Sequence, residues 1–314
     1  SDWSYNDAPD QPRDVTAATR LEYVQLLTVR DDQWPPKWSA VKKAATSQPG
    51  SLWIIGNEPE CPNQGNLTPR KYAERYHEAV NLLRSYDSTA RFAIGGIVEP
   101  TPLRLRWLEE AMTNYYTLFG YSMTADIDVW NIHMQILPEG PGTAGAGEPV
   151  GIVPNPGEAR EYAWSSAADV ELFQSLVSEM RTWLNAKGER AKPLIISEMG
   201  VLMPSYLLVD DPALSEAERT AQGDRMIEQY MTQAFDWMLS ARSATTGCTT
   251  DDNLLVQRWL WFSVNDSFFT EPTNYCGFNG SLFDYQTRTL TRFGRRFVEY
   301  QAQTQRLFIP LGQR

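Results

Sequence analysis

Two glutamates that follow short apolar runs are the strongest candidates for chemistry in this sequence. Glu58 lies in Asn57-Glu58-Pro59, directly after a run of bulky apolar residues, and Glu198 ends a second run, Ile195-Ile-Ser-Glu198. Each run is short, rich in β-branched residues and followed by turn residues, which is typical of a β-strand. The sequence therefore predicts two carboxylates at the carboxyl ends of two strands.

Two opposed carboxyl groups are what the hydrolysis of a glycosidic bond needs. One must hold a proton for the leaving oxygen, and the other must be ionised to attack the anomeric carbon or to activate water. In a parallel barrel all strands end on one face, so Glu58 and Glu198 can meet there although they are far apart in the sequence. The alternative is that each glutamate caps a helix or pairs with a structural arginine.

The rest of the chain alternates strand-like and helix-like segments. The expected strands are Trp3–Tyr5, Glu22–Thr28, Leu52–Ile55, Phe92–Ile97, Ile127–Ile132, Leu194–Ser197 and Trp259–Val264. The clearest helix starts are Thr68-Pro69, an N-cap followed by a first-turn proline, and the capping box Ser215-x-x-Glu218. This alternation predicts βαβ units and a parallel sheet. Because no glycine-rich phosphate loop follows a strand, an α/β fold of the (β/α)8 TIM barrel type fits better than a doubly wound sheet.

The seven expected strands are one fewer than a barrel needs, and a strand at the front of the barrel is not evident in this chain. We expect one domain over residues 1–314, with a Gly/Pro-rich insertion at about 137–164. The insertion follows a strand, so in a barrel it lies on the catalytic face. It is either a wall or lid of the site or a tolerated insertion.

Composition excludes several classes of partner. The chain has 39 acidic and 28 basic side chains, a net charge of −11, which disfavours a nucleic-acid binder. No apolar run approaches the roughly 18–20 residues of a membrane span. With only His77 and His133 present, we expect no metal centre and no cofactor. The three cysteines, Cys61, Cys248 and Cys276, are not expected to form disulfides, because they lie near different strands. The 11 Trp and 14 Tyr residues fit a carbohydrate-binding cleft.

The two glutamate motifs resemble those of clan A retaining glycoside hydrolases, a (β/α)8 superfamily. Asn57-Glu58-Pro59 is similar to the acid/base motif that follows the fourth strand, and Ser197-Glu198-Met199-Gly200 is similar to the nucleophile motif of the seventh. With the Asn57 strand counted as the fourth, the Glu198 strand becomes the seventh, and the missing strand is the first. The resemblance implies that Glu58 is the acid/base, Glu198 the nucleophile, and Asn57 a hydrogen-bond partner of the sugar 2-hydroxyl.

Two further residues match the clan by position. His133 ends the sixth strand, where the clan often has a His or Tyr near the nucleophile, and Trp261 resembles the eighth-strand Trp that floors the pocket, although Trp259 has the same parity. The opening of the chain resembles the compact family 128 endo-β-1,3-glucanases, and families 5 and 39 are alternatives. The sixth strand gives His133-Met-Gln135 where the clan has His-x-Tyr, a departure that bears on the substrate.

The sequence therefore predicts a retaining β-glycoside hydrolase that cleaves a β-linked polysaccharide or oligosaccharide, with β-glucan as one candidate. A non-catalytic carbohydrate-binding barrel and a transglycosylase on the same scaffold are the alternatives. We expect a monomer whose partner is its carbohydrate substrate. Because polymeric sugar lies outside the cell, we expect the protein to be secreted.

Overall fold

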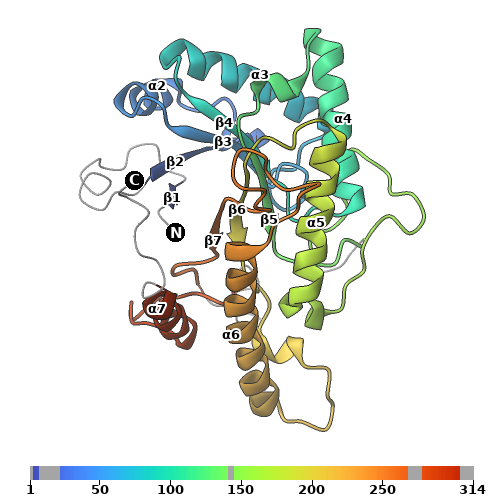
Figure 1. Ribbon diagram of the computed structural model, residues 1–314, viewed down its shortest axis with the longest axis vertical. Coiled ribbons are helices and arrows are strands. Elements are labelled where there is room, and N and C mark those ends of the chain that lie inside the picture. The colour runs from blue at the N-terminus through green and yellow to red at the C-terminus, as the bar shows by residue number, and fades with distance from the viewer. Residues whose placement is uncertain (1–2, 7–21, 141–144, 268–277, 305–314) are drawn as a thin grey trace.

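The computed structural model describes residues 3–6, 22–140, 145–267 and 278–304, and within them the strands form a central sheet with helices around it (Figure 1). All ladders are parallel. The strands are β1 (Trp3–Asn6), β2 (Glu22–Leu27), β3 (Leu52–Asn57), β4 (Arg91–Gly96), β5 (Trp130–Met134), β6 (Leu194–Met199) and β7 (Arg258–Trp261). Every expected strand is present with its ends shifted by a few residues.

The strands follow one another in sequence order. Two sheets, β1-β2-β3-β4 and β5-β6-β7, are joined by parallel bridges between Ala93 and Val129 and between Ile97 and Ile132. The predicted α/β fold with parallel strands is confirmed. Among the described residues no pairing joins β7 to β1, so the structure does not show a closed barrel of eight strands.

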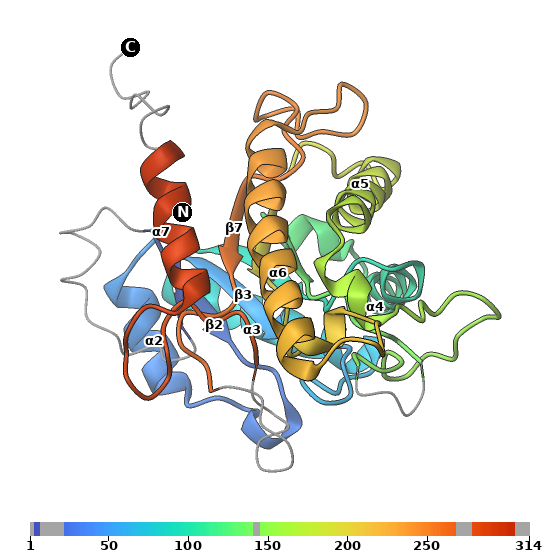
Figure 2. The ribbon, with the colours of Figure 1, turned by 90° about the horizontal axis from the view of Figure 1, so that it is seen from below.

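The helices lie where the apolar periodicity places them. They are α2 (Trp38–Ser47), α3 (Pro69–Tyr86), α4 (Pro102–Phe119), α5 (Val170–Ala186), α6 (Glu216–Ser240) and α7 (Arg292–Thr304), with short 3-10 helices η1 (Asp31–Gln33), η2 (Met123–Asp126), η3 (Trp164–Ala168) and η4 (Ser205–Leu208). Thr68 caps α3, and both halves of the capping box at Ser215 and Glu218 are formed. Figure 2 shows α6 and α7 side by side, and they are joined by the contact of Phe235 with Phe297.

The strands bury apolar residues on both faces, as parallel sheets do. One face carries a cluster of small aliphatic residues from alternate positions: Val24, Leu26, Leu52, Ile54, Ala93, Val129 and Ile195. The other face packs against the helices and uses larger residues such as Trp53, Phe92 and Trp130. The first cluster is the interior of the curved sheet, and the second is the layer between sheet and helices.

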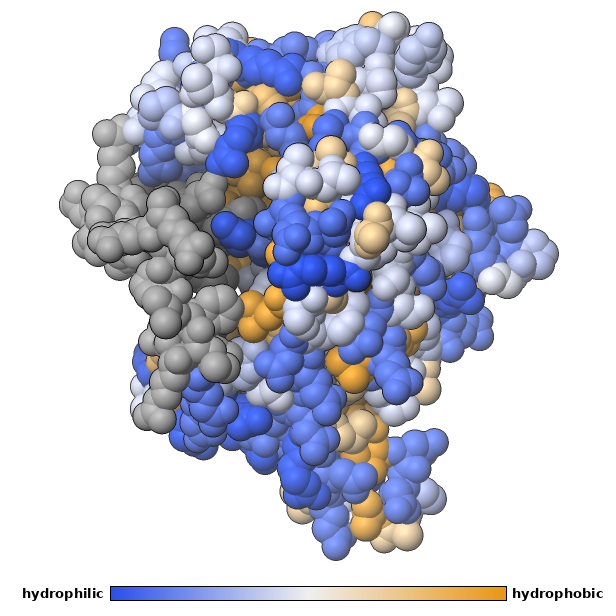
Figure 3. Space-filling model, in the orientation of Figure 1, coloured by the Kyte–Doolittle hydropathy of each residue, from blue (hydrophilic) through white to orange (hydrophobic). Residues whose placement is uncertain are grey.

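The surface in Figure 3 is mainly hydrophilic, with apolar residues in small separate patches. None of the described helices is both long and apolar enough to cross a bilayer. Cys61 and Cys248 are buried free thiols, and Cys276 lies outside the described residues. The expectation of unpaired cysteines therefore holds for the two that are described.

The Gly/Pro-rich insertion packs against the carboxyl ends of the strands. The backbone N–H of Val150 donates to the Glu60 carbonyl at 2.9 Å, and the Trp107 indole donates to the Val150 carbonyl at 2.9 Å. Arg106 of α4 binds the Val153 carbonyl at 2.8 Å and the Glu158 carboxylate at 2.7 Å. The described part of this segment is thus anchored as a wall beside the loop that follows β3.

Candidate active site

The two candidate glutamates lie side by side at the carboxyl ends of β3 and β6. Glu58 follows the last residue of β3, and Glu198 is the penultimate residue of β6. One oxygen of each carboxyl and one nitrogen of His133 all lie within 4.8 Å of one another. Both glutamate side chains are 11% exposed, so they are nearly enclosed but still reachable from solvent. The structure thus brings together three of the five residues that the sequence singled out.

His133, on β5, bridges the two carboxyl groups. Its Nδ1 is 2.9 Å from Glu58 Oε1 and 3.6 Å from Glu198 Oε2. Burial by itself lowers the pKa of His133, but the two neighbouring carboxylates, first Glu198 and then Glu58, outweigh it and raise the pKa to about 9. The imidazole is therefore charged at neutral pH, and one cation faces two acids.

Gly96 makes room for this histidine. A Cβ at Gly96 would lie 2.3 Å from His133 Cδ2 and 2.5 Å from His133 Nε2, too close for any side chain. The preceding residue, Gly95, lies against the backbone of Gly56 in the same way, with a Cβ position 2.8 Å from the Gly56 carbonyl carbon. The glycine pair at the end of β4 therefore lets β3 and β5 approach each other around the site. The sequence analysis placed these two glycines only within an expected strand and gave them no role in the site.

Gln135 is a site residue that the sequence analysis did not assign. It is 1% exposed, and its amide Nε2 donates to Glu198 Oε2 at 3.4 Å. Its carbonyl Oε1 is buried and has no hydrogen-bond partner among the described residues. The departure from His-x-Tyr was the available signal, because it marks the position that reaches the nucleophile candidate.

The backbone at Glu58 adopts an uncommon conformation. Its φ angle is +38°, a region that costs a non-glycine residue roughly 1–2 kcal/mol. Backbone hydrogen bonds hold it there: Glu58 N–H donates to the Gly96 carbonyl at 2.9 Å, and its carbonyl accepts from Cys61 at 3.0 Å and from Gly65 at 3.0 Å. Strained residues persist where the surroundings fix them, and they cluster at functional sites.

The other two predicted site residues, Asn57 and Trp261, lie in different layers of the structure. Asn57 ends β3 next to Glu58, is half-buried, and pairs in register with Gly96. Trp261 lies on the helix-facing side of β7, where its ring contacts Tyr230 of α6 at 6.4 Å between ring centroids. The ring fills the layer between sheet and helices, and the role of Trp261 as the floor of the pocket stays a prediction.

Trp259 faces the same layer as Trp261, with its ring 6.1 Å from that of Phe235. The next aromatic residue along the chain, Phe262, has the other orientation. It packs with Phe278 against a small apolar cluster of loop residues: Cys61, Val98, Leu137, Ala146 and Leu202. Since this cluster lies in the loops that follow the strands, Phe262 is the better aromatic candidate for a sugar contact.

The ligand set of two carboxylates and one imidazole also raises the question of a metal ion. A metal ligand needs a lone pair on the nitrogen that faces the ion. The nitrogen of His133 that faces both carboxylates is within hydrogen-bond distance of Glu58, and with a pKa of about 9 it carries a proton at neutral pH. The arrangement therefore fits a hydrogen-bonded acid cluster better than a metal centre.

Comparison with known proteins agrees with this fold. A family model described as glycosyl hydrolase catalytic core matches residues 1–137, a stretch that includes Glu58 and His133 but ends before Glu198. Residues 1–137 are thus similar to the catalytic core of glycosyl hydrolases. The motif Asn57-Glu58-Pro59 at the end of β3 lies within the matched segment. None of the curated proteins matches the sequence.

Solved glycoside hydrolases share the fold across almost the whole chain. A family 128 subgroup II endo-β-1,3-glucanase from Pseudomonas viridiflava has a TM-score of 0.55 at 18% identity, over 94% of this chain and 88% of that one. A subgroup I endo-β-1,3-glucanase from Amycolatopsis mediterranei with laminaritriose gives 0.53 at 17%, over 96% and 90%. A subgroup III curdlan-specific exo-β-1,3-glucanase from Blastomyces gilchristii with glucose gives 0.53 at 17%, over 94% and 88%. The resemblance to clan A hydrolases, family 128 among them, is confirmed.

Proposed function

We propose that this protein is a retaining β-glycoside hydrolase that cleaves β-1,3-glucan, with Glu58 as acid/base and Glu198 as nucleophile. The observation that carries the proposal is the approach of the two carboxyl groups to within 4.8 Å. Retaining enzymes hold their carboxyl groups about 5–5.5 Å apart, whereas inverting enzymes leave roughly 6.5–9.5 Å for a water molecule. The short separation supports direct attack by a carboxylate.

The reaction follows from these positions in two steps. In the first, a Glu198 oxygen attacks the anomeric carbon while Glu58 gives its proton to the leaving oxygen, so that a covalent glycosyl-enzyme forms and the glycosidic bond breaks. In the second, Glu58 takes a proton from water, and the hydroxide oxygen displaces Glu198 from the anomeric carbon. Two inversions return the β configuration.

Neighbouring residues orient the two acids. His133 donates to Glu58 at 2.9 Å and lies 3.6 Å from Glu198, so one imidazole holds the two carboxyl groups near each other. The Gln135 amide supports the Glu198 oxygen, and its unpartnered carbonyl is an acceptor for a sugar hydroxyl. Asn57 precedes Glu58 at the end of β3, and in this proposal it binds the 2-hydroxyl of the same sugar.

The substrate class comes from the similar structures, which are β-1,3-glucanases from three family 128 subgroups. A β-1,3-glucan is a polymer outside the cell, so we propose that the protein is secreted and acts as a monomer. The anchored insertion would then form one wall of the cleft that the glucan occupies.

Two alanine variants test the proposal. Glu198→Ala should abolish turnover of laminarin and of aryl β-glucosides, because no nucleophile remains. Glu58→Ala should lose laminarin hydrolysis but keep an aryl glycoside with a good leaving group, and added azide should restore turnover as a β-glycosyl azide. Glu179→Ala, on the exposed face of α5, is the matched control and should behave as wild type.

The alternatives are outcomes of the same experiment. If the wild type binds a β-glucan but neither variant differs from it in turnover, the protein is a non-catalytic binding barrel. If products grow longer when an acceptor sugar is added and water does not compete, it is a transglycosylase. Hydrolysis that needs both glutamates supports the proposal.

A further inference from the structure

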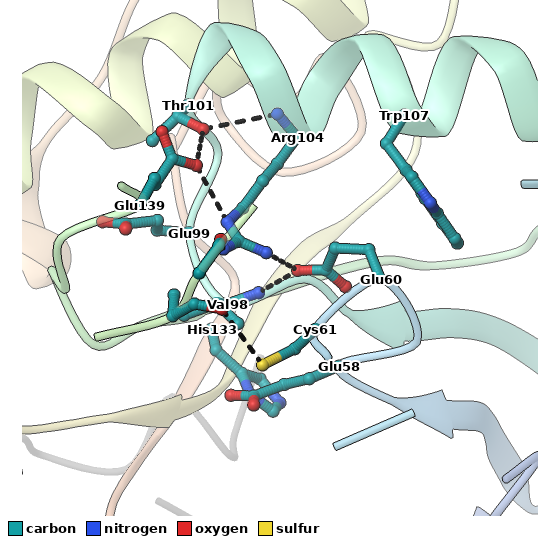
Figure 4. A network of polar contacts seen from close by, with 12 residues as sticks. Glu58, Glu60, Cys61, Val98, Glu99, Thr101, Arg104, Trp107, His133 and Glu139 are labelled. Carbon is teal, nitrogen blue, oxygen red and sulfur yellow. Dashed lines mark hydrogen bonds and ion pairs between the residues drawn. The ribbon is translucent and has the colours of Figure 1, made fainter. Parts of the chain in front are cut away.

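A buried cluster of three carboxyl groups and one guanidinium lies next to Glu58 (Figure 4). Glu60, Glu99, Glu139 and Arg104 each have 0% exposure. Arg104 Nη1 is 2.7 Å from Glu60 Oε1, and Arg104 Nε is 2.9 Å from Glu139 Oε1. Burying charges is costly unless they are paired and hydrogen-bonded, so this group is a built feature of the fold.

Arg104 connects the loops that follow three successive strands. Its carboxylate partner Glu60 belongs to the loop after β3 and also accepts the Val98 N–H, from the loop after β4, at 2.8 Å. Arg104 itself lies in the first turn of α4, and its Nη2 donates to the Gly147 carbonyl, in the segment after β5, at 2.8 Å. One side chain thus ties together the loop that carries Glu58 and the wall of the insertion.

Glu139 and Glu99 add further contacts between the same loops. The Thr101 hydroxyl donates to Glu139 Oε1 at 2.6 Å, and the Arg160 N–H donates to Glu139 Oε2 at 2.8 Å. Burial, and then the neighbouring Glu139, raise the pKa of Glu99 well above its usual range, so the cluster favours the protonated form of this acid. The Oε2 atoms of Glu60 and Glu99 have no hydrogen-bond partner among the described residues, but all four side chains are fully buried, which leaves no opening that a substrate would need.

The role of this cluster follows from the strained backbone two residues before Glu60. At Glu58 a φ of +38° must be maintained by its surroundings. The local backbone hydrogen bonds fix one side of that turn, and the Glu60 side chain fixes the other through Arg104 and Val98. Without the Arg104 contact, the turn can relax and carry the Glu58 carboxyl away from Glu198.

We propose that Arg104 is a positioning residue for the acid/base, which acts through Glu60 to hold Glu58 against Glu198. The inference rests on the proposed function of Glu58, and it adds a residue that touches neither the substrate nor the reacting atoms. It predicts a defect in acid catalysis rather than a general loss of folded enzyme.

The first test is kinetic and uses Arg104 and Arg181, the two fully buried arginines among the described residues, as a matched pair. Arg104→Met should lower kcat for a laminari-oligosaccharide about tenfold or more, but change kcat for an aryl glycoside with a good leaving group less than about threefold. Arg181→Met, whose arginine binds carbonyl groups near the amino ends of β6 and β7, should not change the ratio of the two rates. Equal losses on both substrates in Arg104→Met would overturn the proposal.

The second test does not depend on turnover. The chain has only two histidines, so the ring signals of His133 can be assigned with a His77→Gln variant and titrated by NMR. His133 has a pKa of about 9, held up by its carboxylate neighbours. Removing the Arg104 charge would by itself raise that pKa, whereas loss of Glu58 from His133 would lower it. We expect the pKa in Arg104→Met to fall by about one unit or more. A pKa that stays or rises overturns the proposal.

The two tests separate the inference from the proposed function. If the wild type cleaves no β-glycan, the proposed function fails, and the His133 titration still decides whether Arg104 positions Glu58. If Arg104→Met does not fold, Glu60→Gln takes its place, because it keeps the side-chain shape and the Val98 hydrogen bond but weakens the pairing with Arg104. Because Glu60 itself raises the pKa of His133, the readout for this variant is the kinetic ratio of the first test: a selective loss on the laminari-oligosaccharide is expected, and equal losses on both substrates contradict the proposal.

Discussion

Arg104 and Arg181 are both completely buried, yet they lie at opposite ends of the strands and have different partners. At the carboxyl ends, carboxylates surround Arg104, and Glu60 and Glu139 raise its pKa above the usual range although burial alone would lower it. Near the amino ends, the guanidinium of Arg181 binds the Leu255 carbonyl at 2.6 Å and the Lys192 carbonyl at 3.2 Å. Burial there lowers the pKa of Arg181 to about 10.

The difference indicates that residues at the amino ends of the strands stabilise the fold, whereas residues at the carboxyl ends also take part in the reaction. Near the amino ends, neutral carbonyls satisfy a buried cation, and nothing around it needs to change its charge. At the carboxyl ends, several acids share a few cations, which allows neighbouring groups to hold different protonation states. Changes near Arg181 should therefore affect the folded state alone, whereas changes that break the contact of Arg104 with Glu60 should also affect the reaction. The following experiments test that separation, from the largest expected effect to the smallest.

The pH dependence of stability should come mainly from His133. Its folded pKa of about 9 lies above the ordinary histidine pKa of 6.5, so its stabilising contribution is complete below about pH 6.5 and is lost as the pH rises through about 9. The shift corresponds to about 3 kcal/mol. In urea unfolding, wild type should exceed His133→Gln by about this amount at low pH, and the gap should close toward high pH.

His77 is the control for that experiment. Burial lowers the pKa of His77, so its effect has the opposite sign: the folded protein gains stability as the pH rises through the range where the unfolded histidine loses its proton. His77→Gln should leave the His133 effect intact. A gap between wild type and His133→Gln that does not vary with pH would contradict the assignment of the charge.

Alanine substitutions at two glycines test whether the carboxyl ends of the strands affect activity and the amino ends affect only stability. In Gly96→Ala the new Cβ would meet the His133 ring, with 2.3 Å to Cδ2, and a displacement of about 1 Å at the site should cost about 100-fold in kcat/KM. In Gly247→Ala the Cβ would meet the Asn253 carbonyl oxygen at 1.9 Å, in the loop region that Arg190 also binds. That variant should lose thermal stability, with kcat/KM per folded molecule unchanged. Loss of kcat/KM in both variants would argue against the separation.

Two glutamines provide a smaller test. Gln135→Ala removes a donor to Glu198 and should lower kcat about tenfold, the usual worth of a hydrogen bond to a charged group. Gln257→Ala removes the acceptor of the Leu194 N–H at 2.8 Å near the amino ends and should lower the unfolding midpoint only. Steady-state kinetics and thermal melts on both variants distinguish an effect on kcat from an effect on stability. A Gln135→Ala enzyme with wild-type kcat would remove this residue from the site.

The smallest effect is expected at Glu99. Burial raises the pKa of Glu99, so folding favours the protonated form of this acid over the ionised one. Glu99→Gln mimics the protonated acid and should stabilise the protein by about 1 kcal/mol at neutral pH, while kcat stays near wild type. Chemical denaturation at neutral pH measures it. Destabilisation would mean that Glu99 is ionised within the cluster.

The sequence predicted those parts of the fold that local patterns determine. Strands were recognisable because their apolar runs are short and β-branched, and helices because Thr68 and Ser215 provide their caps. The meeting of Glu58 and Glu198 was predictable from topology, since parallel strands bring their carboxyl ends to one face. The catalytic roles of these two residues stay a prediction until the variants are measured.

The parts that the sequence did not give depend on the three-dimensional contacts. Trp261 and Trp259 have the same parity, and only the packing of α6 decides that both face the helices; a register shift between β6 and β7 changes the alternation there. The roles of Gly96 and Gln135 need the position of His133 and Glu198. Arg104 forms contacts with residues of three loops, and no local pattern in the sequence connects them.

The central claim is that a carboxylate attacks the sugar directly, and the anomer of the first product tests it. Wild-type enzyme should be mixed with a β-1,3-linked oligosaccharide, and proton NMR spectra recorded before mutarotation proceeds. The account predicts that the new reducing end appears first as the β anomer and then drifts to equilibrium. Initial release of the α anomer would show that water attacks the substrate, and would contradict the roles of Glu58 and Glu198.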